Sequence, residues 1–186
     1  GYPLAPPVEA VRLGLYALVR IGIYESLAAA TLDASGQPVS NWWPVAYAMQ
    51  RLGNPKGAPA LVALLGTDGR YTASFAARGL GTMKAQDSAH LLRAIVQERR
   101  REPSVIIQAI RTLATLDDAG SVEVLSSVVT DPKMERMLRL EALTALSTIR
   151  SRAQPSSASL APSRKALRCS IEWKVSSVAA ASRAPP

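Results

Sequence analysis

The chain has 186 residues, room for one ordinary domain, and no apolar run reaches the roughly 18 residues needed to cross a membrane. Hydrophobic residues make up 48% of the chain but aromatic residues only 5%, so Ala, Leu, Val and Ile must supply the core. Of these four residue types, Ala and Leu favour helices. A single cysteine and a single histidine exclude an internal disulfide and a metal site built from Cys and His, and we expect no cofactor.

The net charge of +8 is concentrated towards the C-terminal end. Residues 1–149 hold 15 Lys/Arg and 13 Asp/Glu, whereas residues 150–186 hold 7 Lys/Arg and one acid, Glu172. Because a nearly neutral body does not attract a polyanion, we expect no specific nucleic-acid binding and no membrane association. The chain starts at Gly1 without Met or a signal peptide, which indicates a fragment or a trimmed chain, from the cytoplasm or the bacterial periplasm.

A helical pattern recurs along residues 8–149. Counting back from an Ile or Leu anchor, small or apolar residues stand mostly 3, 4 and 7 positions earlier, which is one face of an α-helix. Before the anchor Leu52 these residues are Met49, Ala48 and Val45. Small side chains at these positions let a neighbouring helix approach closely. The anchors are spaced 28 to 36 residues apart: Ile21, Leu52, Leu80, Leu116 and Ile149.

A second helix is predicted after each of the three middle anchors. Apolar residues stand 6, 9 and 12 positions after Leu52 and Leu116, and the same offsets after Leu80 give a weaker match. The three sets are Ala58, Leu61 and Leu64; Gln86, Ala89 and Leu92; and Val122, Leu125 and Val128. Each unit therefore reads as two helices joined by a short turn.

Turn residues mark the helix ends. Glycine directly follows three anchors, where it predicts a helix end in the left-handed conformation: Gly22, Gly53 and Gly81. Ser104 and Asp131 are predicted to cap the helices that follow them. Asp117 and Asp118 are predicted to cap the start of a second helix, where negative charge suits the helix dipole.

Two stretches resemble HEAT repeats. Residues 138–149 (LRLEALTALSTI) are similar to that family's first helix, and residues 53–61 (GNPKGAPAL) to its turn and second-helix start. The resemblance implies an all-α fold over residues 1–149, an α-solenoid of about four to five HEAT-like antiparallel helix pairs forming an armadillo-like right-handed superhelix. The first unit departs from the pattern because it has no clean Asp-Pro turn. A non-repetitive helical bundle is the alternative.

A narrower resemblance concerns residues 41–52 (NWWPVAYAMQRL), 69–72 (GRYT) and 75–81 (FAARGLG). These stretches look like the HEAT region of bacterial proteins that join such repeats to a C-terminal cyclophilin-type peptidylprolyl isomerase. No cyclophilin segment occurs in this chain, so the resemblance implies only the non-catalytic part of such a protein.

The composition changes after Ile149. Ser, Ala, Pro and Arg supply 25 of the 36 positions in residues 151–186, too polar a mixture to bury a core. We expect residues 150–186 to be a basic tail, either poorly ordered or translated out of frame. A short helix carrying Leu167, Ile171 and Trp173 is the alternative. Without a second helix to cover Glu135–Ile149, we expect this helix to fray, or the chain to self-associate through that open end.

Catalytic motifs are absent from the sequence. A Ser-His-acid triad would need His90, but no Gly-x-Ser-x-Gly motif is present, and we expect a non-enzyme with His90 at the surface. Gly79-Leu80-Gly81 ends a predicted helix instead of following a strand, so it is interpreted as a helix end and not as a nucleotide-binding motif. The run Arg99-Arg100-Arg101 is interpreted as a solvated helix end, with a phosphate contact as the alternative.

The predicted function is a non-catalytic protein-interaction scaffold that binds a protein or peptide on its concave face. Second helices usually line that face, so His90, Arg93 and Gln97, which lie on a predicted second helix, are the candidate contacts to the partner. Of Trp42 and Trp43, we expect one to pack between the first and second units, and the other either to pack as well or to contact the partner. The alternatives are the accessory region of a peptidylprolyl isomerase and a HEAT-like enzyme such as a bilin lyase or a DNA glycosylase.

Overall fold

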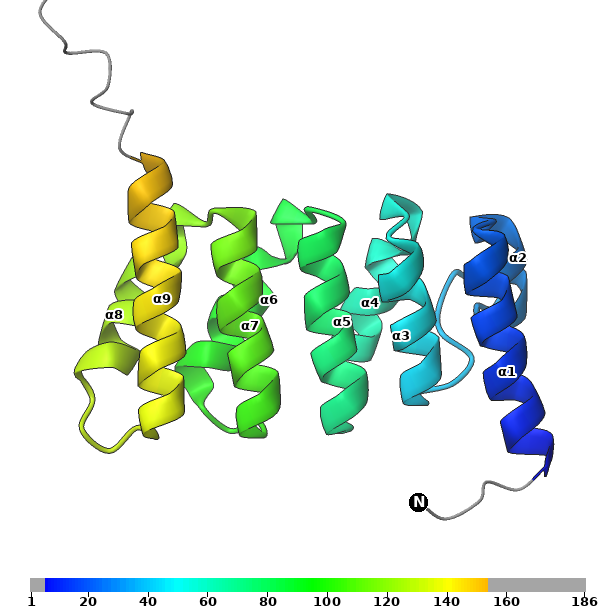
Figure 1. The fold of residues 1–186 in the computed structure, drawn as a ribbon, viewed down its shortest axis with the longest axis horizontal. Helices are drawn as coiled ribbons and strands as arrows, with labels where there is room; N and C mark the ends of the chain where they lie inside the picture. Colours follow the sequence, from blue (N-terminus) through cyan, green and yellow to red (C-terminus); the bar gives the residue numbers. More distant parts are fainter. Residues whose placement is uncertain (1–5, 154–186) are drawn as a thin grey trace, which may run out of the picture. The chain divides into compact units, whose positions relative to one another are not determined.

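The structure is a computed structural model that describes residues 6–153 (Figure 1). The chain divides into two units, Gly1–Arg152 and Ala153–Pro186, and the helical body belongs to the first. From position 154 on, the basic tail predicted for residues 150–186 lies outside the described residues, as does the alternative helix around Trp173. The helix expected to end at Ile149 continues to Ala153.

Residues 6–153 form nine α-helices and three short 3-10 helices and contain no strand. An isolated bridge between Leu32 and Pro38 is the single extended pairing in this range. The prediction of an all-α fold is therefore confirmed for the described part of the chain. The elements are α1 (Pro6–Ile21), α2 (Tyr24–Thr31), α3 (Trp43–Leu52), η1 (Pro55–Gly57), α4 (Ala58–Leu65), α5 (Arg70–Thr82), η2 (Gln86–Ser88), α6 (Ala89–Glu98), α7 (Pro103–Leu116), η3 (Ala119–Ser121), α8 (Val122–Thr130) and α9 (Arg136–Ala153).

The helices form two layers (Figure 1). Helices α1, α3, α5, α7 and α9 lie side by side in what we call the first-helix layer, and α2, α4, α6 and α8 lie behind them in the second-helix layer. Contacts are most extensive between α3 and α5 and between α5 and α7, and each of α4 and α6 also packs on the first helix that follows it. Every helix thus contacts its neighbours in the series.

The predicted buried face is confirmed in four of the five first helices. In α3, α5, α7 and α9 the residues 4 and 7 positions before the anchor are all buried, and Leu52 is the one anchor of these helices that is only half-buried. Alanines at these positions allow close helix contacts, as expected. The buried residues 4 and 7 positions before the anchors are Ala48 and Val45, Ala76 and Ala73, Thr112 and Ala109, and Ala145 and Ala142.

The prediction is wrong for α1, where the buried face is shifted by one residue. Ile21 is 61% exposed, while Leu15 is buried and Leu18 and Val19 pack against the core. Gly22, with φ +80°, takes the position that the anchor holds in the other helices. Among the described helices α1 packs mainly on α2 and α3, and neither of them buries Ile21.

Gly53 and Gly22 end their helices in the left-handed conformation as predicted, but Gly81 does not. Helix α5 continues through Gly81 to Thr82, and the left-handed residue is Lys84. Glycine is needed in α5 for packing instead. A Cβ at Gly81 would lie 3.1 Å from Cγ2 of Thr112. Gly79-Leu80-Gly81 lies in the last turn of α5, so its interpretation as a helix end is confirmed, although no left-handed glycine ends the helix.

The predicted side-chain caps are not formed. Ser104 lies inside α7, and Asp131 accepts a hydrogen bond at 2.9 Å from the amide of Lys133, several residues before α9 begins. Asp118 makes no cap either, because its carboxylate lies 3.5 Å from Nε of Arg93.

Side-chain hydrogen bonds between elements follow the repeat spacing. Thr112 donates to the carbonyl of Ala77 at 2.9 Å, Gln86 to that of Leu116 at 2.6 Å, and Thr72 to that of Asn41 at 2.8 Å. These partners are 35, 30 and 31 residues apart, close to the anchor spacing. Units that follow each other along the chain therefore bond to each other directly.

The arginine run joins units on both sides of it. Arg101 donates to the carbonyls of Thr67 at 2.6 Å and Leu65 at 3.0 Å, which are free acceptors at the C-terminal end of α4. Arg99 pairs with Asp131 on the opposite side, and hydrogen bonds from Lys133 and Arg99 lower the pKa of Asp131. Of the three arginines, Arg100 alone matches the predicted solvated helix end.

Replacing Arg101 with Met should lower the free energy of unfolding by about 1–2 kcal/mol, because the carbonyls at the end of α4 lose a charged donor. Arg100→Met, at the adjacent exposed position, is the matched control and should change stability by less than about 0.5 kcal/mol. Urea denaturation followed by circular dichroism measures both. Equal effects of the two substitutions would contradict a capping role for Arg101.

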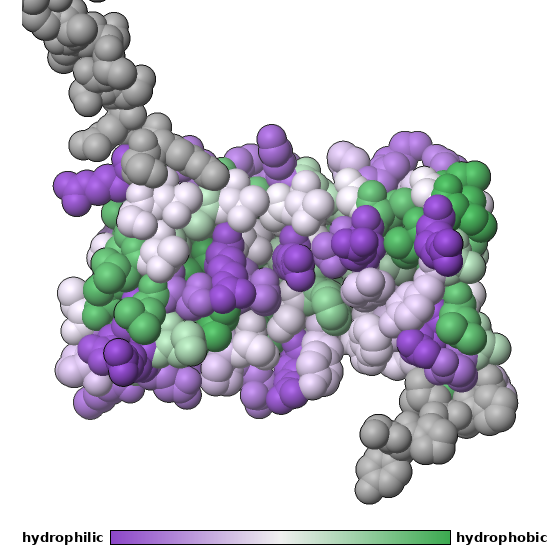
Figure 2. All heavy atoms as spheres, viewed as in Figure 1, coloured by the Kyte–Doolittle hydropathy of each residue, from purple (hydrophilic) through white to green (hydrophobic). Residues whose placement is uncertain are grey.

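Apolar side chains remain exposed on the outermost helices of the described range (Figure 2). Figure 2 shows hydrophobic residues gathered over α1 and over α9, and a more polar surface between them. The exposed residues include Val11, Leu13 and Ile21 on α1 and Met137, Leu140 and Leu143 on α9. Self-association through the α9 end stays a prediction, and these side chains are the ones it would bury.

Candidate functional site

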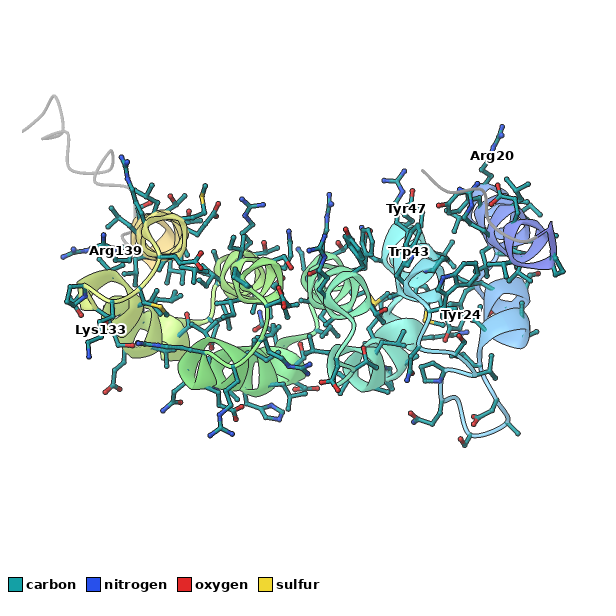
Figure 3. All side chains as sticks on the ribbon, turned by 90° about the horizontal axis from the view of Figure 1, so that it is seen from below. Arg20, Tyr24, Trp43, Tyr47, Lys133 and Arg139 are labelled. Carbon is teal, nitrogen blue, oxygen red and sulfur yellow. The ribbon has the colours of Figure 1, made fainter. Side chains whose placement is uncertain are left out.

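Four aromatic side chains form a cluster on the first-helix layer. Tyr16 of α1 contacts Tyr47 of α3, with ring centroids 5.5 Å apart, and Tyr47 contacts Phe75 of α5 at 5.4 Å. Trp43 lies 5.9 Å from Phe75 and 6.3 Å from Tyr47. All four are half-buried, so each ring packs between helices and also offers a face or an edge to the surface. Figure 3 shows Trp43 and Tyr47 projecting from α3.

A groove continues from this cluster between α5 and α7. It consists of two hollows, of about 200 and 350 Å³, that share Arg78 and Gln108 as lining residues. We call it the α5–α7 groove. The hollow next to the cluster is lined by Tyr71, Ser74, Phe75, Arg78, Ser104 and Gln108, and the other by Arg78, Gly81, Thr82, Gln108, Arg111, Thr112 and Thr115.

The next interval, between α7 and α9, carries a third hollow of about 310 Å³. Arg111 donates to both carboxylate oxygens of Glu141 across it, with Nε at 2.9 Å from Oε2. This bonding lowers the pKa of Glu141, so its carboxylate stays ionised well below neutral pH. Arg111 is therefore already neutralised by an acid of its own chain.

The two layers follow a shallow arc within the first unit, with the first-helix layer on its inner side (Figure 3). Contacts between α6 and α8 are sparse compared with those between α5 and α7. Small residues explain the difference, because Gly79, Gly81 and Ala76 let the first helices approach closely while the second helices stay further apart. The expectation that second helices line the concave side is therefore wrong for this chain.

The second-helix residues predicted to bind a partner lie away from the cluster and groove. His90, Arg93 and Gln97 belong to α6, in the other layer. Nδ1 of His90 donates to the carbonyl of Asp87 at 2.7 Å, and Arg93 faces Asp118. A further hollow between α4 and α6 is lined by Val62, Leu65, Gly66, Leu91, Ala94, Ile95, Glu98 and Arg101. The three predicted residues are not among them.

The two tryptophans have different environments. Trp43 packs against Phe75 of α5, and Tyr16 and Tyr47 make an aromatic contact between the first and second units. Trp42 is the residue before α3, half-buried, and its amide hydrogen-bonds to Oγ of Ser40 at 3.2 Å. Of the five predicted partner-binding residues, Trp43 is the one that the structure places in the aromatic cluster.

A positional signal in the sequence marks this surface. Counted from the sequence anchors, the residue five positions earlier lies on the first-helix layer, and in the first three units it is aromatic, even though the buried face of α1 is shifted by one residue. The five residues are Tyr16, Tyr47, Phe75, Arg111 and Thr144. Alignment of the five anchors therefore predicts these surface positions, whereas a search limited to buried positions does not find them.

Comparison with known proteins gave no match, either to a protein-family model or to a curated protein. None of the helices described is long and apolar enough to span a membrane. Within residues 6–153 no three His, Cys, Asp or Glu side chains come together as metal ligands would. The first-helix layer provides aromatic contact area and, in the α5–α7 groove, arginine and amide hydrogen-bond donors.

Proposed function

We propose that residues 6–149 form a HEAT-like α-solenoid with a right-handed superhelix that serves as a protein-interaction scaffold. The hydrogen bonds between units support this, since they join residues about one repeat apart. In such a stack each unit supports only its neighbours, and the layers present a long continuous surface. The resemblance of residues 138–149 and 53–61 to HEAT repeats points the same way.

The observation that carries the proposal is the half-exposed aromatic cluster beside the α5–α7 groove. Aromatic residues amount to only 5% of the chain, yet four of them meet at one place on three successive first helices. Packing alone would be served by the aliphatic residues, mainly Ala, Leu, Val and Ile, that fill the rest of the core. Tyrosine and tryptophan with exposed faces are the residues that most often supply binding energy at interfaces. The binding surface is therefore the first-helix layer.

Selection from a displayed library of random 12-residue peptides tests this proposal. Selected peptides should bind the full chain with a Kd below about 100 μM. Tyr71→Ala, an exposed substitution at the groove, should weaken binding about tenfold, which corresponds to a modest interface hot spot. His90→Ala, an exposed substitution in the second-helix layer, is the matched control. Peptides weakened by His90→Ala and indifferent to Tyr71→Ala would place the site on the other layer and refute the proposal.

A further inference from the structure

The lining of the α5–α7 groove has positively charged side chains and no negatively charged ones. The positive charges belong to two arginines. Arg111 is held by Glu141, but no ion pair or hydrogen bond joins the exposed guanidinium of Arg78 to another described residue. Arg78 lines both hollows, so an unneutralised cation lies at the middle of the groove.

Unused hydrogen-bonding groups surround this cation. Oγ of Ser74 is buried and has no hydrogen-bond partner among the described residues, and the half-buried side chain of Gln108 makes no hydrogen bond to any of them either. A buried polar group without a partner is costly, so its presence in a groove lining indicates a place where an incoming group completes the bonding. Ser74, Arg78 and Gln108 line the same hollow.

An apolar platform lies one helical turn from Arg78. Phe75 precedes it by three residues on α5, and Tyr71, 55% exposed with the guanidinium of Arg70 over one face of its ring, precedes Phe75 by four. Three residues of helix rise about 4.5 Å, to which the long, flexible side chain of Arg78 adds reach. In an extended peptide, side chains on the same face are two residues and about 6.6 Å apart. An extended peptide can therefore place an apolar side chain against Phe75 and a carboxylate against Arg78. The two peptide residues that carry these groups are separated by one other residue.

We propose that the α5–α7 groove binds extended acidic peptides, with an aromatic or aliphatic side chain against Phe75 and Tyr71 and a carboxylate, two residues away, on Arg78. This rests on the proposed function and names the class of partner. A nucleic acid fits less well, because strong binding to phosphates needs several unpaired cations, and the groove supplies one. Arg78 offers a planar fork that can bind a carboxylate through two hydrogen bonds.

The test uses fluorescein-labelled peptides in which Ser and Gly flank the sequences Phe-Ser-Glu or Glu-Ser-Phe, and the same peptides with Gln in place of Glu. Anisotropy is measured on the full chain at low ionic strength. One of the two orders should bind about tenfold more tightly with Glu than with Gln, the ratio expected for a hydrogen bond to a charged group. Arg78→Gln should remove that preference, while Arg100→Gln, which changes the net charge equally, should keep it.

Several results would overturn the inference: no preference for Glu in either order, a preference that survives Arg78→Gln, one that Arg100→Gln removes, or a duplex DNA that displaces the peptide at lower concentration. If library peptides bind through Tyr71 but show no preference for acids, the inference fails and the proposed function stands. Because Arg78 and Arg100 are both exposed, circular dichroism should show both variants folded as the parent chain.

Discussion

Gly79→Val should lower the free energy of unfolding by about 2–3 kcal/mol, within the range for added volume in a well-packed core. A Cβ at this position would lie 2.5 Å from Cδ1 of Leu61 and 3.3 Å from Cα of Gln50. Leu61 is fully buried and cannot swing aside, and the Gln50 atom belongs to the backbone of α3. Helix α5 would have to move away from both α3 and α4.

Gly14→Ala is the matched control for this substitution. Gly14 is also helical, but a Cβ there would meet no atom within 4 Å. Alanine favours the helix over glycine by about 1 kcal/mol, so this substitution should raise stability by up to that amount. Urea denaturation followed by circular dichroism measures both variants. If Gly79→Val unfolded at the same urea concentration as the parent, α3, α4 and α5 could not be as closely packed as described.

Leu80→Ala should cost about 3 kcal/mol, whereas Ile21→Ala should change stability by less than about 0.5 kcal/mol. Both residues are anchors of the same sequence pattern. Leu80 is fully buried and leaves a cavity between helices when it is truncated, but Ile21 is 61% exposed and leaves none. The same denaturation measurement compares them. A similar cost at the two positions would mean that α1 keeps the register of the other first helices after all.

The stack itself was predictable from local sequence. Alanine and leucine at helical spacing predict the helices, and recurrence of the anchors predicts one pair of helices per unit. The buried faces of α3, α5, α7 and α9 followed from that pattern because each of these helices meets a neighbour of the same kind. Gly53 was predictable as well, since the left-handed conformation at a helix end is a local requirement.

The candidate site was only partly accessible from the sequence. Trp43 could be singled out because tryptophan is unusual beside Pro44 at a helix start. The positions of Tyr16, Tyr47 and Phe75 share one offset from their anchors, so the cluster could have been found from the pattern. Nothing in the local sequence distinguishes Arg78 from the other exposed arginines, because its lack of an acid partner depends on residues from other helices.

The sequence by itself determined the helices, their pairing into units and the buried faces of α3, α5, α7 and α9. The tertiary structure alone decided the register of α1, the packing role of Gly79 and Gly81, the paired roles of Arg99 and Arg101, and which layer lies on the inner side of the arc. Helix formation depends on residues three and four positions apart in the sequence. These other features depend on side chains about one repeat away, and the distance between their helices is set by the size of the residues packed between them.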